Sequence, residues 1–189
     1  MKQGIRRGLV LVLAGVLVLG VAGIAGGKVK TRTFSSGDID RAIPDPGTTS
    51  HVFDLKKKRF KRSKVKDVDV AVRITHEDVE DLLISVTAPN GREVDLSSMN
   101  GTDFDNDYGT GDQSCSGELT VFNDEAEASV EDAEAPFTGQ YVPEDPLSEL
   151  DRSRVKGLWR VSVEDYDSAL TGELNCAELQ VKYKKKKKR

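Results

Sequence analysis

The residues best suited to acid–base chemistry in this chain are its two histidines, His51 and His76. A serine hydrolase needs a nucleophile, a histidine base and an orienting carboxylate within hydrogen-bonding reach of one another. The sequence around the two histidines has no strand-to-helix turn that would present a nucleophilic serine. We therefore expect that the chain is not an enzyme.

A second kind of chemistry is calcium binding by the loop 98–116, which is rich in Asn, Gly, Asp and Ser. Its candidate ligands, at alternate or nearby positions, are Asp103, Asp105, Asp107 and Asp112. Calcium takes about six to eight oxygen ligands from flexible loops of this kind. The EF-hand pattern is not met, because Tyr108 and Ser114 stand where that loop needs Gly and Glu. Two interpretations stay open: a looser calcium site completed by Asp81 and backbone carbonyls, or a solvated acidic loop.

Two cysteines, Cys115 and Cys176, can form one disulfide if the chain is exported. In the chain-entropy model, closing such a loop contributes about 4 kcal/mol to the free energy of unfolding. The alternative is two buried free thiols.

The beginning of the sequence predicts export. Arg6 and Arg7 precede an apolar run, 8–25, that ends in small residues. This pattern is typical of a secretory signal peptide, here cleaved near Ala25. The alternative is a membrane anchor, because a run of about eighteen residues is at the lower limit for spanning a bilayer. The rest of the chain is then either secreted, or anchored by residues 8–25 and facing the outside.

The net charge of −4 conceals a strong segregation of charge. Residues 67–178 contain 28 Asp and Glu against 6 Lys and Arg, a local balance of −22, whereas 56–66 and 182–189 carry eight and seven basic residues. So acidic a body excludes nucleic acid as the expected partner. The basic tail, 184–189, can contact a cell wall or another anionic surface, with about 1 kcal/mol for each basic residue at a lipid surface. A solvated tail is the alternative.

The scaffold that must position these residues is predicted to consist of strands. Leu82, Ile84 and Val86 alternate with more polar residues in the run 82–88, as in a strand with one buried face. Pro89-Asn90-Gly91 then predicts a turn, and 92–97 can return as the second arm of a β-hairpin.

Further strands are expected at 50–55, 65–74, 118–123, 157–165 and 174–183, with an exposed hairpin loop at 56–62. About eight short strands without a convincing helix predict an all-β fold, an antiparallel β-sandwich or jelly roll. The expected organisation is an extended linker at 26–47, the sandwich at 48–183 and the basic tail.

Several motifs, taken in order, resemble the P domain, also called the P/Homo B domain, over about residues 50–183. The first half of the resemblance lies in His76, Asp81-Leu82, Ile84 and Pro89-x-Gly91. The second half lies in Ala135-Pro136-Phe137-Thr138-Gly139-Gln140-Tyr141 with Pro143 and Leu147, Gly157-x-Trp159-x-Val161-x-Val163-x-Asp165, and a closing hairpin with Gly172-x-Leu174-Asn175 and Leu179.

The resemblance implies a non-catalytic module of the kind that packs on the catalytic domain of kexin- and furin-type subtilisin-like proprotein convertases. It implies that the partner is a secreted subtilisin-like serine endopeptidase, and that His76 has a structural role. The competing interpretation is a cell-surface or carbohydrate-binding module. In that case Trp159, Tyr141 and Phe137 would line a sugar-binding face, whereas a buried Trp159 is the ordinary expectation for a sandwich strand.

Overall fold

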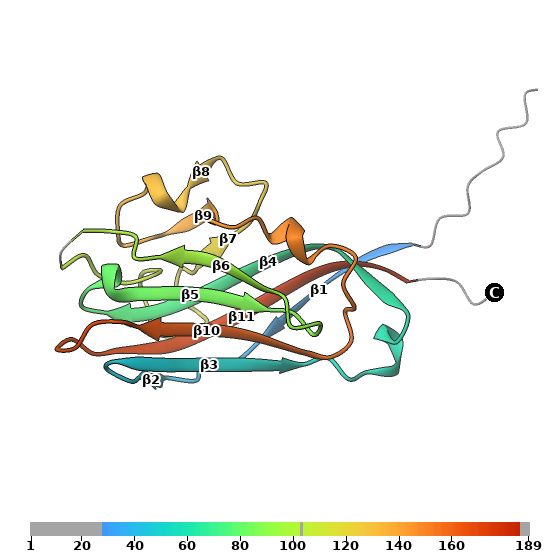
Figure 1. Cartoon of the computed structure of the whole chain (residues 1–189), viewed down its shortest axis with the longest axis horizontal. Helices are drawn as coiled ribbons and strands as arrows, with labels where there is room; N and C mark the ends of the chain where they lie inside the picture. Colours follow the sequence, from blue (N-terminus) through green and yellow to red (C-terminus); the bar gives the residue numbers. More distant parts are fainter. Residues whose placement is uncertain (1–27, 103, 186–189) are drawn as a thin grey trace, which may run out of the picture.

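The computed structural model describes residues 28–102 and 104–185, and these residues form two β-sheets that pack face to face (Figure 1). The larger sheet runs in the order β1 (Val29–Ser35), β11 (Gly172–Lys185), β4 (Ser63–His76), β7 (Thr120–Phe122), β9 (Gly139–Val142), β8 (Ala128–Ser129), with β2 (Arg41–Ile43) also paired to β11. The smaller sheet runs in the order β3 (Gly47–Asp54), β10 (Leu158–Asp165), β5 (Leu82–Thr87), β6 (Glu93–Ser98).

The connections contain four short 3-10 turns: η1 (Lys58–Phe60), η2 (Val79–Asp81), η3 (Val130–Asp132) and η4 (Leu147–Leu150). Strand neighbours are antiparallel except for β9, which lies parallel to both β7 and β8. The predicted all-β sandwich is confirmed. It has eleven strands in the described part of the chain, rather than about eight.

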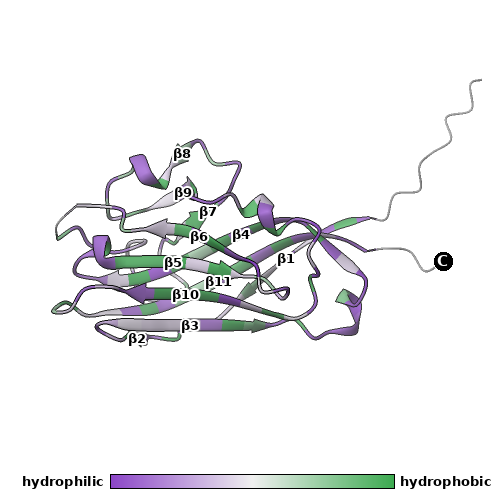
Figure 2. Ribbon diagram, viewed as in Figure 1, coloured by the Kyte–Doolittle hydropathy of each residue, from purple (hydrophilic) through white to green (hydrophobic). Residues whose placement is uncertain are grey.

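The core lies between the two sheets. β4 and β11 have 14 residues each and pair along nearly their whole length, with Val72 opposite Ala177. Because side chains alternate along a strand, one face of β4 points inward. The inward side chains, none more than 2% exposed, are Val68, Val70, Val72 and Ile74. Figure 2 shows hydrophobic residues following the strands and hydrophilic ones gathering in the connections.

The smaller sheet supplies the facing half of the core through the residues that alternation predicted. The side chains of Leu82, Ile84, Val86, Trp159, Val161 and Val163 are all fully buried. The predicted hairpin is formed by β5 and β6, and its turn is closed because the Gly91 amide donates to the Ala88 carbonyl at 2.9 Å. Gly91 has φ of +82°, a conformation that glycine adopts without steric cost.

The expected linker is wrong as a description of residues 29–43. β1 pairs with β11 from Val29 opposite Lys184 to Ser35 opposite Glu178, and β2 continues the pairing near Gly172. β1 has a mostly exposed surface, so hydrophobic patterning gave no signal for it. Its backbone hydrogen bonds cover the edge of β11, which would otherwise present unpaired groups.

Two connections predicted as hairpin turns instead cross between the sheets. The basic segment 56–62 joins β3 of the smaller sheet to β4 of the larger one. Phe60 anchors it, being 1% exposed with its ring edge-on to Tyr183 at 5.4 Å. The segment 166–171 likewise joins β10 to β11, so the expected closing hairpin is a crossover.

No helix within 28–102 and 104–185 is long and apolar enough to cross a membrane. The predicted signal peptide or anchor, 1–25, and most of the basic tail lie outside the described residues.

Candidate functional site

Three connections meet at one end of the sandwich, on the left in Figure 1: residues 77–81, 99–107 and 166–171, which we call the loop end. They surround a cavity of about 510 Å³. Its lining combines carboxylates with apolar side chains, among them Asp78, Asp81, Asp167, Met99, Phe104 and Leu170. The loop end is the place where β4, β5, β10 and β11 begin or finish, so the two sheets fix its geometry.

Exposed apolar side chains concentrate at the loop end. Six large hydrophobic residues are exposed in the described chain, and three of them, Met99 (51%), Phe104 (74%) and Tyr166 (49%), belong to these connections. The Tyr166 amide donates to the Asp81 carbonyl at 3.0 Å, which holds the third connection against the first. Met99 and Phe104 line the same cavity, and exposed apolar surface beside polar groups is typical of an interaction site. The loop end is therefore the candidate site for a protein partner.

A buried histidine organises the base of the loop end. His76, which ends β4, is 1% exposed, and its Nε2 lies 3.1 Å from Oδ2 of Asp165, which ends β10 and is 2% exposed. Nδ1 lies 2.5 Å from the Asp78 carbonyl oxygen, to which an Nδ1–H donates, and 3.1 Å from the Asp78 amide, which donates to Nδ1 in the other tautomer. Both ring nitrogens are thus engaged in structural hydrogen bonds. A β-carbon on Gly172 would lie 2.3 Å from the imidazole, so the ring requires glycine there.

The other histidine occupies a different strand. His51 lies on β3 with its ring edge-on to Phe53 at 4.6 Å. Partial burial lowers its pKa, and the nearby Arg41 charge lowers it further. The two histidines are therefore components of two separate packing arrangements.

A buried arginine fixes the acidic loop. Arg73 on β4 is 2% exposed, and its guanidinium donates to the carbonyls of Ile74 and Tyr108 at 2.9 and 3.3 Å. It also forms an ion pair with Oδ2 of Asp107 at 3.2 Å, while Oδ1 of Asp107 accepts from the His76 amide at 3.0 Å. Asp107 thus ties the loop to β4 with both carboxylate oxygens.

The described residues of the predicted calcium set have different surroundings. Asp105 accepts from the amide and the hydroxyl of Thr102, both at 3.0 Å, whereas Asp112 lies among the exposed residues that follow Gly111. Asp81 lines the loop-end cavity, and Asp103 lies outside the described residues. Burial raises the pKa of Asp81, and repulsion from Asp78 and Asp167 raises it further. Calcium binding by the predicted set stays a prediction.

A carboxylate group that the sequence did not single out lies on the larger sheet. Oxygens of Asp67, Asp69 and Glu125 lie within 4.8 Å of one another. Burial raises the pKa of Asp69, and the charge of Asp67 is the main cause of the raised pKa of Glu125. Asp67 and Asp69 alternate along β4 and so share a face, which is the only signal of this group in the sequence.

The predicted disulfide joins Cys115 of the acidic loop to Cys176 of β11 across 61 residues of chain. The bond is partly covered, since Cys176 is fully buried and Cys115 is half-buried. It attaches the far end of the acidic loop to the central strand pair, as Arg73 and Asp107 attach its middle.

The aromatic sugar-binding face is not formed. Trp159 and Phe137 are fully buried, which confirms the core position expected for Trp159. The indole N–H donates to the Val155 carbonyl at 3.0 Å, and the Phe137 ring stacks on Tyr108 at 4.6 Å. A sugar could reach neither ring without unfolding the sandwich.

The chain is similar to one family model and to parts of solved structures. The family model described as the proprotein convertase P-domain matches residues 65–181. No curated protein matches the chain. Among solved structures, the chain is similar to the serine protease of Aeromonas sobria, with 17% identity and a TM-score of 0.49 over 82% of this chain and 27% of that one.

It is also similar to the A. sobria serine protease in complex with the chaperone ORF2, with 16% identity and a TM-score of 0.48 over 85% of this chain and 28% of that one. The chain thus spans about a quarter of the length of these matched proteins. The matched family range takes in more than half of the sequence, from the inner part of β4 to Val181 in β11. The chain therefore belongs to the proprotein convertase P-domain family, a non-catalytic domain of these subtilisin-like proteases.

Proposed function

We propose that this protein works outside the cytoplasm as a non-catalytic P domain that binds a secreted subtilisin-like serine endopeptidase and stabilises it. The observation that supports this most is the exposed apolar surface of the loop end, on a domain whose family accompanies proteases. The disulfide supports the location, because such bonds persist in oxidising compartments.

The chemistry of the loop end indicates what the partner surface must offer. Burying an exposed Phe or Met side chain contributes about 1.5–3 kcal/mol, so Phe104 and Met99 are suited to be anchors of an interface. The neighbouring carboxylates of Asp78, Asp81 and Asp167 favour a partner with an apolar pocket beside basic side chains.

The experiment is co-purification of the tagged protein from the culture medium of its own cells, followed by identification of bound serine proteases. We expect a subtilisin-like protease to be retained, and its activity to survive heating longer when this protein is present. Met99→Ser combined with Phe104→Ser should abolish retention. If no secreted serine protease is recovered with the unaltered protein, the proposal is wrong.

Leu158→Ser is the matched control for the loop-end variant. Leu158 is 54% exposed, comparable to Met99, but it begins β10 at the end of the strand away from Asp165 and the loop end. We expect this variant to retain the protease as the unaltered protein does. Loss of retention in both variants would assign the effect to general surface hydrophobicity.

A second candidate function is attachment to an anionic surface through the basic tail, possible alongside protease binding. β11 carries Lys182 and Lys184 toward the end of the described chain, where β1 contributes Lys30 next to them. Retention on isolated cell wall should weaken with added salt and with deletion of 184–189. Retention that persists without the tail would exclude this route.

A further inference from the structure

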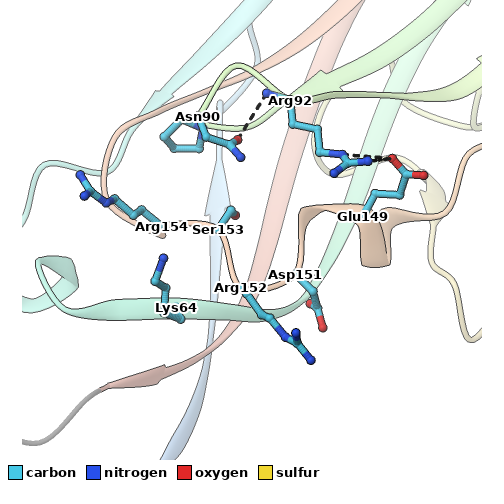
Figure 3. Close-up of a pocket in the computed structure, with 9 residues that line it drawn as sticks. Lys64, Asn90, Arg92, Glu149, Asp151, Arg152, Ser153 and Arg154 are labelled. Carbon is cyan, nitrogen blue, oxygen red and sulfur yellow. Dashed lines mark hydrogen bonds and ion pairs between the residues drawn. The ribbon is translucent and has the colours of Figure 1, made fainter.

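A second cavity, of about 400 Å³, opens at the end of the sandwich away from the loop end (Figure 3). Three segments that are remote in sequence form it: the start of β4, the turn between β5 and β6, and the chain that follows η4. Figure 3 shows Lys64, Arg154, Asn90 and Ser153 arranged around the opening, with Arg92 paired to Glu149 at one side.

The cavity carries unbalanced positive charge. Of its four basic residues, Arg92 forms an ion pair with Glu149 at 2.6 Å. The others, Lys64, Arg152 and Arg154, form no ion pair with any carboxylate in the described part of the chain. The lining contains two carboxylates, Glu149 and Asp151, against these four basic residues, so its charge is positive although the protein as a whole is acidic. Positive charge gathered in a concave site attracts anionic ligands.

Two polar atoms of residues that line the cavity lie beneath its surface without a partner. Oδ1 of Asp151 and Oγ of Ser153 are both buried, and neither has a hydrogen-bonding partner within the described chain. Solvent reaches neither atom, so neither is a contact for a ligand in the cavity. The groups that a ligand can reach are the exposed Arg152 and Arg154 and the half-buried Lys64.

The backbone here is held rigidly in an uncommon conformation. The Val65 amide donates to the Ser153 carbonyl and the Arg152 amide to the Val65 carbonyl, each at 3.1 Å. Arg152 has φ of +63°, a left-handed conformation in which an arginine is strained and glycine is not. Strain of this kind gathers at functional sites, where the surroundings hold it in place. The site is therefore preformed.

The mixed lining selects the chemical class of the ligand. A phosphate or sulfate concentrates its charge at one point of a cavity whose lining also contains Glu149 and Asp151. An acidic polypeptide segment has separate carboxylates on flexible side chains. Each carboxylate can therefore pair with one basic residue of the lining and keep away from Glu149 and Asp151.

We propose that this cavity binds an acidic segment of a partner polypeptide. The carboxylates of the segment pair with Lys64, Arg152 and Arg154. The site is independent of the proposed protease contact, because β5 separates the hairpin turn beside this cavity from the loop end. Both surfaces can be occupied at once.

The test is direct binding of a labelled synthetic peptide of alternating Glu, Asp and Gly to the purified protein, measured by fluorescence anisotropy. The matched peptide has Gln and Asn in place of the acids, and inorganic phosphate serves as a competitor. We expect the acidic peptide to bind and the amide peptide not to bind, with phosphate competing only weakly. Equal binding of both peptides, no binding of either, or full displacement by phosphate at matched concentration would overturn the proposal.

Two variants separate the cavity from the general basic surface. Arg152→Gly removes the guanidinium and relieves the backbone strain, so the melting temperature should stay the same or rise. The Kd of the acidic peptide should increase about tenfold, which corresponds to about 1.4 kcal/mol of binding free energy. Lys61→Ala removes an exposed charge of the basic connection outside the cavity and should leave the Kd unchanged. An equal loss of peptide affinity in the two variants would mean that binding is non-specific electrostatic attraction, and would overturn the proposal.

A second copy of this chain is the remaining source of acidic peptide, since 124–134 carries six acidic residues. Sedimentation at low salt distinguishes the two sources. If the protein stays monomeric, the acidic segment comes from a polypeptide other than a second copy of this chain. Self-association that Arg152→Gly abolishes would overturn that assignment in favour of a second copy.

Discussion

Nε2 of His76 lies 3.1 Å from Oδ2 of Asp165, and this hydrogen bond joins the last residue of β4 in one sheet to the last residue of β10 in the other. Both side chains are almost fully buried, so water contributes little to either. The pair joins the two sheets at the loop end, beside the fully buried Leu82, which lies opposite Asp165.

Replacing His76 with Ala should lower the free energy of unfolding by about 3 kcal/mol, because a buried acceptor on Asp165 loses its partner. Asp165→Asn keeps one oxygen that can accept from Nε2 and should cost less than half as much. Urea denaturation followed by tryptophan fluorescence measures both, through the buried Trp159. If Asp165→Asn destabilises the protein as much as His76→Ala does, the prediction is wrong.

Reduction of the Cys115–Cys176 bond should lower the free energy of unfolding by about 4 kcal/mol, because the 61-residue loop is no longer closed in the unfolded chain. The double variant Cys115→Ser with Cys176→Ser should show the same loss without reductant. Guanidinium denaturation in the presence and absence of dithiothreitol provides the comparison. A reductant effect that persists in the double variant would have another cause.

The contribution of the carboxyl groups to stability should increase as the pH falls from neutral toward the ordinary carboxyl range, while His51, whose pKa is lowered by burial, contributes in the opposite direction. Burial raises the pKa of Asp69, Asp81, Asp95 and Asp151, and the Asp67 charge raises that of Glu125. A carboxyl whose pKa is higher in the folded state binds its proton more tightly there, so its contribution is complete below the unfolded pKa and is lost as the pH rises through the folded pKa.

The melting temperature measured across mildly acidic to neutral pH checks this direction. Asp69→Asn removes one of the buried charges and should flatten the increase, since the amide cannot ionise. The exposed Asp132 is a suitable control, and Asp132→Asn should leave the slope unchanged. A melting temperature that falls steadily from neutral pH downward would contradict the prediction.

Calcium should raise the melting temperature if the acidic loop binds it, because a ligand that binds only the folded state stabilises that state. Asp105→Ala should then abolish the increase. Thr102→Ala breaks the hydroxyl contact to Asp105 but keeps the carboxylate, so it should preserve the calcium response. If Asp69→Asn abolishes the calcium response and Asp105→Ala does not, calcium binds to the group of Asp67, Asp69 and Glu125 instead.

The sequence predicted the elements whose stability comes from alternating burial. Leu82, Ile84 and Val86 of β5, and Trp159, Val161 and Val163 of β10, have the inward face that their spacing requires. The sequence does not predict β1, because this strand is held by backbone pairing to β11. Backbone hydrogen bonds do not require a particular pattern of side chains. The same limit explains why the side-chain pattern at 56–62 and 166–171 predicts hairpin turns where the structure has crossovers.

The candidate sites depend on contacts that no local pattern contains. His76 was singled out by resemblance, but its partner Asp165 is 89 residues away. Arg73 and Asp107 are 34 residues apart, and the second cavity brings Lys64 and Asn90 together with Arg154. Only the unusual exposure of Phe104 and the positive φ of Arg152 mark these places, and both are properties of the folded chain.

The pairing of β1 with β11 determines how the domain responds to tension. Val29 lies opposite Lys184, so the two ends of the described chain leave side by side from the same end of the sandwich. A force that pulls these two ends apart acts across the strands, so the hydrogen bonds between β1 and β11 break one pair after another. A shearing force would instead act on all of the pairs at once. β1 is mostly exposed, so it can detach from β11 while the core stays packed. The chain can then lengthen under tension without unfolding of the domain.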